Sequence, residues 1–446
     1  MKKPLYNSLK KYKKLKRASF HTPGHKCNFF KSKDLFNLDF TELPLTDSLY
    51  EANGIIKKSE ENLSKLYNTE LSLFSLGGNT LCIQSMLRLS SPKGGKILCD
   101  RLVHRSAISA MALLGINPTW ILREYNQESK TFDKLNLAML EKELSSNEKF
   151  NAMYLTSPDY YGVLQDVKSI SSKCKKFDVP VLVDNAHGSH LMFTGENLHP
   201  LSQGALMTAD SAHKTLPVLT GGAWLHINSK KTSRKEAKSA MALFGSTSPL
   251  YSTMASMDIA QNWLYYSGKK EFLNLEKRVS HIKSIAKSKG IFVFEGRLVD
   301  PTRITLGVWS IGKTGYEFRD YLYKYKIEPE FCDQNYVVLI PTSFNTKQEW
   351  ERLKRAILNI DACSLSNNFI EENKFEKLPE VCASLREALM SEKTKIKLSD
   401  AKNQIAGDIV CPCPPGVPIV MPGEKIGDYE IWALKQYGIN EIYVLK

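Results

Sequence analysis

From about residue 66 onward, short apolar runs alternate with longer amphipathic stretches. The short runs predict strands, and the stretches between them predict helices. A chain that alternates in this way folds as an α/β domain, in which helices flank a mostly parallel sheet. The expected strands lie at residues 71–74, 96–99, 152–155, 179–183 and 223–227.

The 446 residues suffice for more than one packed unit. A strand at 303–308, a helix at 315–325 and a strand at 336–340 predict a smaller α+β domain, and a further helix is expected around Leu385. The predicted organisation is a turn-rich and irregular N-terminal arm at 1–65, a large domain at 66–300, a small domain at 301–363, and a linker with a C-terminal domain at 364–446.

Polar residues and glycines gather where the expected strands end, and open parallel sheets bind ligands at that edge. Gly78, Asn79 and Thr80 follow the strand at 71–74 and precede a helix. Glycine lets backbone N–H groups approach an anion, and the helix N-terminus adds its positive dipole. The turn suits a single phosphate group, and its spacing is not that of a nucleoside-triphosphate or dinucleotide loop. An ordinary tight turn with a helix cap is the alternative.

Lys214 lies in a short polar segment with Ser211 and His213. An amine attacks an aldehyde only when part of it is neutral, and partial burial near other cations favours the neutral form. Ser211 and His213 can both bond an anion. The segment therefore suits a lysine that holds pyridoxal 5'-phosphate (PLP) as a Schiff base. A solvated Lys–His pair on the surface is the alternative.

Asp184 ends the buried strand at 179–183, where a carboxylate is costly unless it has a partner. In a PLP enzyme the partner is the protonated ring nitrogen, whose charge makes the ring a better electron acceptor. Ala186 is small enough for a flat ring to lie against it, and His187 can bond a ring oxygen or a substrate carboxylate. A helix-capping or arginine-paired carboxylate and a structural histidine are the alternatives.

His104 follows the strand at 96–99. Its imidazole can stack on a pyridine ring and transfer a proton. The alternative is that His104 only caps the start of the next helix. Residues 156–158 and 160–162 end the third strand and offer polar contacts to a ring or a substrate. The order along the chain is phosphate turn, stacking histidine, polar strand end, aspartate and lysine. This order at the ends of one sheet predicts a PLP site in which Lys214, His104 and His187 are catalytic.

Five motifs combine these residues with their neighbours: HTPGHK at 21–26, RLVHRS at 101–106, TSPDYYG at 156–162, DNAHG at 184–188 and SAHKTL at 211–216. Together they resemble the Orn/Lys/Arg decarboxylase family of fold-type-I PLP enzymes. STSPLY at 246–251 and CPPGVP at 413–418 extend the resemblance over nearly the whole chain. The chain is most similar to the compact Gram-positive-type members, which lack the N-terminal wing domain of the larger inducible decarboxylases.

The resemblance implies a role for each matching position. Lys214 would hold the cofactor covalently, Asp184 would pair with the ring nitrogen, and His104 would stack on the ring. The phosphate would be held by Gly78, Asn79, Thr80 and Ser211, with His213 nearby. Thr247 and Ser248 would reach the phosphate of a neighbouring subunit in a homodimer, and the arm at 21–26 would help to close the site. Asn79 and Asn185 depart from the family, which commonly has serine and glutamate there.

The expected reaction is decarboxylation of arginine, lysine or ornithine to agmatine or a diamine. One alternative is another fold-type-I activity, such as an aminotransferase or a lyase, for which Arg303 is the candidate that would clamp the α-carboxylate. The other is a basic binding protein on a decayed scaffold, which the net charge of +14 and the departures at Asn79 and Asn185 favour. The acids that can recognise the distal end of the substrate are Glu42, Asp47, Glu330, Asp333 and Glu424.

The excess charge lies mainly at residues 10–17, 230–238 and 269–289, which we interpret as a solvated basic surface, so nucleic acid is not an expected partner. No apolar run reaches the length of about 18 residues that a membrane span needs. The nine cysteines are scattered, and Cys411-Pro412-Cys413 has no second pair that would complete a metal site. Scattered cysteines predict a reducing, cytoplasmic setting.

Overall fold

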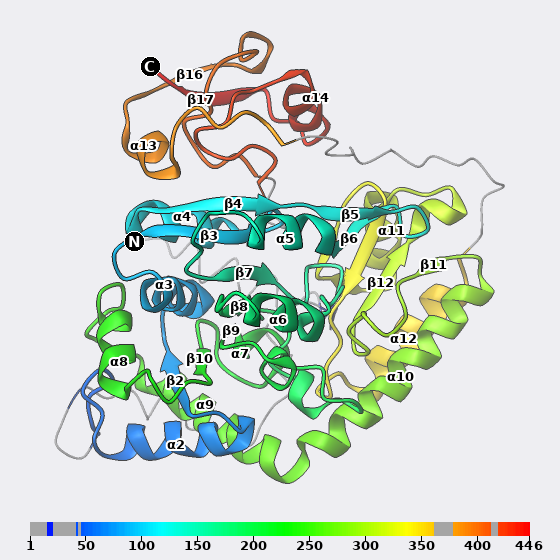
Figure 1. Ribbon diagram of the computed structural model, residues 1–446. Coiled ribbons are helices and arrows are strands. Elements are labelled where there is room, and N and C mark those ends of the chain that lie inside the picture. The colour runs from blue at the N-terminus through cyan, green and yellow to red at the C-terminus, as the bar shows by residue number, and fades with distance from the viewer. Residues whose placement is uncertain (1–15, 21–41, 43–45, 361–377, 412–417) are drawn as a thin grey trace, which may run out of the picture.

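The computed structural model describes residues 16–20, 42, 46–360, 378–411 and 418–446. The motif at 21–26 and most of the one at 413–418 lie outside these residues. A seven-stranded sheet forms the centre of the molecule (Figure 1), and β10 runs antiparallel to both of its neighbours while the other pairs are parallel. The strands, in spatial order, are β2 (Leu71–Ser75), β10 (Ala223–Ile227), β9 (Met207–Asp210), β8 (Val181–Asp184), β7 (Met153–Thr156), β3 (Gly95–Asp100) and β4 (Ile116–Ile121).

Successive side chains of the central strands enter two separate cores, one on each face of the sheet, as the two-residue period of a strand requires. In β3, Ile97 and Cys99 pack against α3, α4 and α8, whereas Leu98 packs against α5 and α6 on the other face. These helices are α3 (Gly78–Ser90), α4 (Arg105–Leu114), α8 (Arg234–Ala242), α5 (Leu137–Leu144) and α6 (Val167–Lys175). The predicted α/β fold with a mostly parallel sheet is therefore confirmed.

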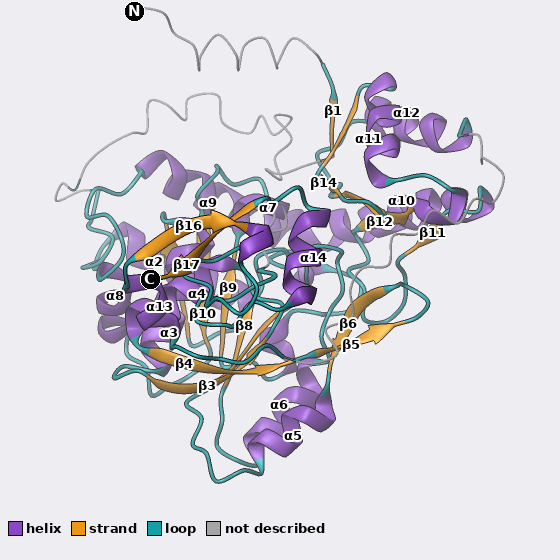
Figure 2. Ribbon diagram, turned by 90° about the horizontal axis from the view of Figure 1, so that it is seen from above, coloured by secondary structure: helices purple, strands orange, loops and turns teal. Residues whose placement is uncertain are grey.

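A smaller antiparallel sheet has the order β11-β12-β15-β14. Its strands are β11 (Phe292–Val293), β12 (Ile304–Gly307), β15 (Tyr336–Leu339) and β14 (Phe331–Cys332). The helices α10 (Lys269–Ser288), α11 (Gly315–Lys324) and α12 (Lys347–Leu358) pack around it, and Figure 2 shows α11 and α12 at the opposite end of the molecule from α5 and α6. β11 precedes the predicted boundary at residue 300 and still pairs with β12.

The described part of the N-terminal arm is more regular than expected. β1 (Ala18–Phe20) pairs with β13 (Ile327–Pro329) beside the small sheet. The sequence predicted irregular structure up to residue 65. That prediction is wrong for residues 55–65, because they belong to α2 (Ile55–Tyr67). Ile56, Leu63 and Tyr67 recur on one buried face, and Asp47 accepts hydrogen bonds from the backbone N–H groups at the helix start.

The C-terminal unit has a core of its own and lies above β3 and β4 in Figure 1. It contains α13 (Leu385–Met390), β16 (Lys393–Lys397), α14 (Asp428–Gln436) and β17 (Glu441–Leu445), and β16 pairs with β17. A buried ion pair of 2.8 Å between Arg101 and Glu424 joins it to the large domain. Leu385 of α13 enters the same core as α4, so this unit is packed against the central sheet rather than tethered to it.

Candidate active site

Asp184 and Lys214 come together at the edge where the parallel strands end. β8 ends at Asp184, and Asp184 pairs in register with Ala209 of β9. β9 ends one residue later, and the chain turns at once into α7 (Ala212–Thr215), which carries Lys214. Since the strands are parallel, their carboxyl ends share one edge, as the sequence interpretation required.

The amine of Lys214 lies within hydrogen-bond distance of His187, whose Nε2 is 3.0 Å from the lysine Nζ. The ring of Tyr160 lies over the same amine, with its centroid 6.0 Å from Nζ. Burial lowers the pKa of Lys214, and the negative charges of Asp184 and Glu330 oppose that shift. The amine is therefore more often neutral than an exposed lysine, which is the state that attacks an aldehyde.

Asp184 is 2% exposed and accepts two hydrogen bonds on the same oxygen. The Asn79 amide donates at 2.7 Å and the backbone N–H of Ala186 at 3.2 Å. Burial raises the pKa of Asp184 to about 6, against lowering contributions from Lys214 and these hydrogen bonds. A buried carboxylate whose charged form is this costly is a ready partner for a cationic group of a ligand.

His187 is buried between a lysine and an arginine. Its Nε2 faces Lys214, and its Nδ1 lies 3.5 Å from Nη1 of Arg303. The Tyr160 ring packs edge-on against the imidazole at a centroid distance of 4.8 Å. Burial and the positive charges of Lys214 and Arg303 hold the pKa of His187 well below its ordinary value, so the ring is neutral.

His104 caps the N-terminus of α4, where its Nδ1 accepts a hydrogen bond from the backbone of Ser106. The residue surface is exposed at the rim of the site, yet the protein atoms around the imidazole and the charge of Lys214 lower its pKa to about 4. The helix-cap alternative therefore holds, and it does not conflict with stacking, because capping uses only Nδ1. The stacking role stays a prediction.

The turn at 77–80 starts α3, and Gly78 has φ +64°. A Cβ at Gly78 would meet nothing within 4 Å, so the space beside this turn is open. Gly78 donates its N–H to Gly221 O, whereas the side chain of Asn79 turns toward Asp184. Thr80 is exposed. An anion at this turn would thus meet backbone N–H groups and the hydroxyl of Thr80.

The remaining predicted positions fall into two groups. Ser211 is buried, with its hydroxyl 3.3 Å from Nδ1 of His213, and Ala186 is also buried, beside Asp184. Thr247 and Ser248 instead lie exposed on the loop between α8 and α9 (Tyr251–Trp263). Among the described residues, no hydrogen bond joins this loop to the amine of Lys214.

The five candidate acids differ in what they contact. Asp47 accepts backbone hydrogen bonds at the start of α2, Asp333 accepts from Tyr161 and two backbone N–H groups, and Glu424 pairs with Arg101. Glu330 is half-buried, lies 3.5 Å from the Tyr160 hydroxyl, and its charge acts on Lys214. Of the five, Glu330 is therefore the acid that the fold brings to the lysine, whereas the charge of Glu42 acts on Tyr251.

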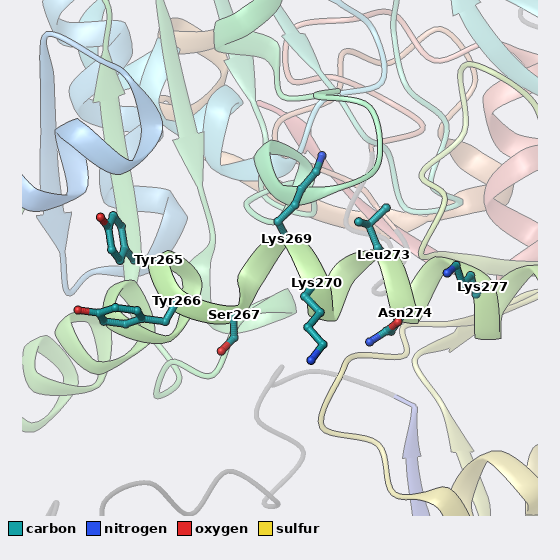
Figure 3. A pocket seen from close by; sticks show the side chains of 8 residues that line it. All are labelled: Tyr265, Tyr266, Ser267, Lys269, Lys270, Leu273, Asn274 and Lys277. Carbon is teal, nitrogen blue, oxygen red and sulfur yellow. The ribbon is translucent and has the colours of Figure 1, made fainter.

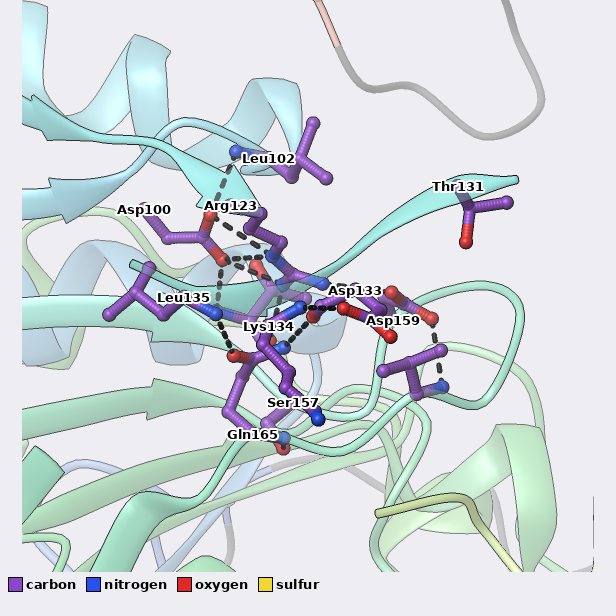
Figure 4. A network of polar contacts seen from close by, with 12 residues as sticks. Asp100, Leu102, Arg123, Thr131, Asp133, Lys134, Leu135, Ser157, Asp159 and Gln165 are labelled. Carbon is purple, nitrogen blue, oxygen red and sulfur yellow. Dashed lines mark hydrogen bonds and ion pairs between the residues drawn. The ribbon is translucent and has the colours of Figure 1, made fainter. Parts of the chain in front are cut away.

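A buried ion network fixes the strand ends beside the site (Figure 4). Arg123, at the start of β5 (Arg123–Asn126), binds Asp100 with two nitrogens and reaches Asp159 at 2.8 Å and the carbonyl of Thr156 at 2.9 Å. It therefore ties the end of β3 to the loop that carries Tyr160. Sequence reasoning missed Arg123, although a charged residue directly after the apolar run at 120–122 is a usable signal.

Behind Asp184, Asn185 takes part in a second buried network. Its amide donates to Asp210 at 2.9 Å, and His199 lies 2.8 Å from the same carboxylate oxygen. A glutamate at 185, as the family commonly has, would place a second carboxylate against Asp210. The departure at Asn185 therefore matches its surroundings in this chain.

Solved structures resemble this chain in fold. Lysine decarboxylase A from Pseudomonas aeruginosa superposes with a TM-score of 0.77 at 16% identity, over 99% of this chain and 80% of that one. An alanine–glyoxylate aminotransferase from Nostoc sp. superposes with a TM-score of 0.55 at 14% identity, over 68% and 85%. The fold is that of the fold-type-I PLP enzymes.

Comparison of the sequence with known proteins identifies one family within this class. Residues 3–305 match the Orn/Lys/Arg decarboxylase major domain, and residues 368–437 match the C-terminal domain of the same family. The arginine decarboxylase of Bacillus subtilis (strain 168) is 28% identical over 96% of this chain and 92% of its own length. The chain belongs to the Orn/Lys/Arg decarboxylase family of amino-acid decarboxylases. Among the described residues, no helix is long and apolar enough to cross a membrane.

Proposed function

We propose that this chain uses PLP at Lys214 to remove the α-carboxylate of a basic amino acid as CO₂, which leaves agmatine or a diamine. The observation that carries the proposal is the meeting of an enclosed lysine, a buried carboxylate and a second, half-buried carboxylate in one site. Arginine, lysine and ornithine all carry the distal cation that Glu330 suits.

The residues at the site fit PLP in three respects. Lys214 is an enclosed amine beside a neutral histidine, which suits an aldehyde. Asp184 is a buried carboxylate with a raised pKa, which suits a protonated ring nitrogen. The α3 N-terminus, open beside Gly78, suits a phosphate group. These three features lie at the edge of one sheet, as a ligand with an aldehyde, a ring nitrogen and a phosphate requires.

PLP, when bound, supplies a ring that accepts the electron pair left at Cα. Asp184 would pair with the ring nitrogen and keep it protonated. Lys214 Nζ and His187 Nε2, 3.0 Å apart, form the pair that holds a proton near Cα and returns it after CO₂ leaves. The aromatic side chains of Tyr160 and Phe331, with centroids 5.4 Å apart, keep water away from this side of the site.

Arg303 bears on the choice between decarboxylation and amino transfer. An aminotransferase needs an arginine that clamps the α-carboxylate, but Arg303 is 1% exposed and its guanidinium contacts His187 and the carbonyl of Tyr160. Its hydrogen bonds thus go to the histidine and to the tyrosine backbone, and it acts on Lys214 through its charge. An α-carboxylate without a bidentate partner is easier to lose, which favours the decarboxylase proposal.

We further propose a homodimer in a cytoplasmic setting. The exposed loop with Thr247 and Ser248 would then complete the phosphate site of the second subunit. The alternative of a decayed binding protein is less well supported, because Lys214, His187 and Asp184 keep reactive surroundings that a binding surface does not need.

A substrate panel tests the proposal. The PLP-loaded protein is incubated with arginine, lysine and ornithine, and CO₂ and the amine products are quantified. We expect stoichiometric CO₂ and amine from at least one of them, whereas keto acid without CO₂ would identify an aminotransferase and overturn the proposal.

The variant Glu330→Gln tests the distal contact. Losing a hydrogen bond to a charged group costs about 1.5–3 kcal/mol, so kcat/KM should fall roughly 10- to 100-fold, mainly through KM. Glu328→Gln is the matched control two residues away, since its carboxylate binds Arg17 and Tyr323 instead. Equal effects of the two variants would exclude Glu330 as the distal acid.

A further inference from the structure

Arg303 contacts one ring nitrogen of His187, Nδ1, and Lys214 contacts the other, Nε2. Its Nη1 lies 3.5 Å from Nδ1 of His187 and 3.4 Å from the carbonyl oxygen of Tyr160. The two residues are 116 positions apart in the chain and meet because Arg303 directly precedes β12. A fully buried guanidinium against a histidine needs a reason, because removing a cation from water is costly.

The fold fixes the direction of the Arg303 side chain. Gly162 has φ +88°, and a Cβ there would lie 2.7 Å from Cγ of Arg303, so the glycine leaves room for the arginine stem. On the other side, Nη2 lies 3.7 Å from Oδ2 of Asp300, which itself binds His190 and Thr302. The guanidinium is thus directed at His187 before any ligand arrives.

This contact determines which nitrogen of His187 carries the proton. A guanidinium has only N–H donors, so Nδ1 of His187 must be the acceptor and carry no hydrogen. Burial and neighbouring cations keep the imidazole neutral, so its single proton resides on Nε2. Nε2 faces Lys214 Nζ at 3.0 Å, and an N–H there has an acceptor only if the amine is uncharged.

We propose that Arg303 is a positioning residue that fixes His187 as its Nε2–H tautomer, so that His187 donates a hydrogen bond to Lys214 Nζ and favours the uncharged amine. The importance of Lys214 for the reaction rests on the proposed function, but the tautomer does not. Removing the arginine leaves Nδ1 of His187 without its donor, so both tautomers become populated.

Other charges also face this pair, and their effects must be separated from that of Arg303. Asp184 and Glu330 favour the protonated amine, whereas His104 and His213 share the sign of Arg303 in their effect on His187. These groups change the charge balance of the site, but among the described residues Arg303 alone lies within hydrogen-bond distance of Nδ1 of His187. The tautomer therefore reports on Arg303 specifically.

The first experiment reads the tautomer directly in the cofactor-free full chain. The imidazole nitrogens are labelled with ¹⁵N, and the His187 signals are assigned by their loss in His187→Gln. In the wild type, Nδ1 should resonate as an unprotonated nitrogen and Nε2 as an N–H. Arg303→Met should give a mixture of both forms, Arg303→Lys should restore most of the wild-type pattern, and Arg303→Gln replaces the Met variant if that one is unstable.

Lys283→Met is the matched control, because it removes another buried cation that interacts with Asp300 but is not among the groups whose charge acts on His187. It should leave the tautomer unchanged. The proposal is overturned if folded Arg303→Met and Arg303→Gln keep the wild-type tautomer, or if Lys283→Met alters it as strongly.

The second experiment measures how fast Lys214 in the cofactor-free chain is acylated as a function of pH. Losing the Nε2–H donor and a nearby positive charge should raise the apparent pKa of Lys214 in Arg303→Met and slow acylation at neutral pH about 3- to 10-fold. Unchanged acylation would overturn the link to Lys214. If the wild type has the Nε2–H tautomer of His187 but releases no CO₂, that result would contradict the proposed function and leave the role of Arg303 standing.

Discussion

Lys214 differs from two lysines of α10, Lys270 and Lys277, in what surrounds the amine. Lys214 lies beside His187 and under the ring of Tyr160, at the edge of the central sheet. Figure 3 shows Lys270 and Lys277 extending from α10 beside a shallow hollow of about 430 Å³, next to Tyr265 and Tyr266, which are 73% and 76% exposed. Both regions combine lysines with aromatic rings, but Lys270 and Lys277 are exposed, whereas Lys214 is half-buried and its amine lies against a buried histidine.

Enclosure, not the number of lysines nearby, distinguishes Lys214 from Lys270 and Lys277. Burial lowers the pKa of Lys214, which increases the neutral fraction that can attack a carbonyl carbon. Lys270 and Lys277 contribute to the net charge of +14 and are exposed to water on α10. The positive net charge of the chain and the presence of an enclosed lysine at the candidate site are thus independent properties.

The largest expected effect is the difference in CO₂ release between an alanine substitution at Lys214 and one at Lys270. Lys214→Ala should reduce CO₂ release by about 10⁴-fold or more, which is the scale of losing a covalent catalytic group. It should also abolish the absorbance band that borohydride bleaches in the loaded wild type. Lys270→Ala should retain wild-type rates, and comparable losses in both variants would contradict the assignment of Lys214.

Buried and exposed ion pairs extend the same comparison to stability. Glu424→Gln leaves the guanidinium of Arg101 buried without its counter-charge, which costs about 3–5 kcal/mol. The thermal unfolding midpoint should fall by several degrees. The pair Lys395–Glu441 bridges β16 and β17 on the surface, and Lys395→Ala should leave the midpoint unchanged. Similar shifts for the two variants would mean that burial does not decide the strength of these pairs.

The fold could largely be predicted because its central strands are continuous apolar runs with turn signals after them. All five expected strands form, at β2, β3, β7, β8 and β10. β4 was not predicted, since Asn117, Pro118 and Thr119 interrupt its apolar pattern. It is an edge strand that pairs with β3 alone, where such residues are tolerated.

The site could be predicted only as far as its local motifs reach. Lys214, Asp184 and His187 each follow a strand closely in sequence, so a pattern indicates them. The contact between Arg303 and His187 joins two domains, and no local pattern encodes it. The candidate acids show the same limit. Only the packed structure shows that Glu330 lies near the hydroxyl of Tyr160, whereas Asp333 accepts a hydrogen bond from Tyr161.

The smallest expected effect is on the pH dependence of stability, and it tests directly whether the Asp184 carboxylate is enclosed. Burial raises its pKa from the ordinary value of 3.8 to about 6, so between these values the folded, cofactor-free chain holds a proton that the unfolded chain has lost. Its stability should therefore be full below about pH 4 and decrease as the pH rises through 6, by about 3 kcal/mol at most.

Asp184→Asn has no such proton to lose, so its unfolding midpoint should lack this decline between pH 4 and 6. Asp428→Asn, which removes an exposed carboxylate from α14, should keep the wild-type decline. If Asp184→Asn and the wild type change in parallel over this range, Asp184 is not held in the costly environment that its burial implies. The site would then offer a cationic ring nitrogen no more than an ordinary surface carboxylate does.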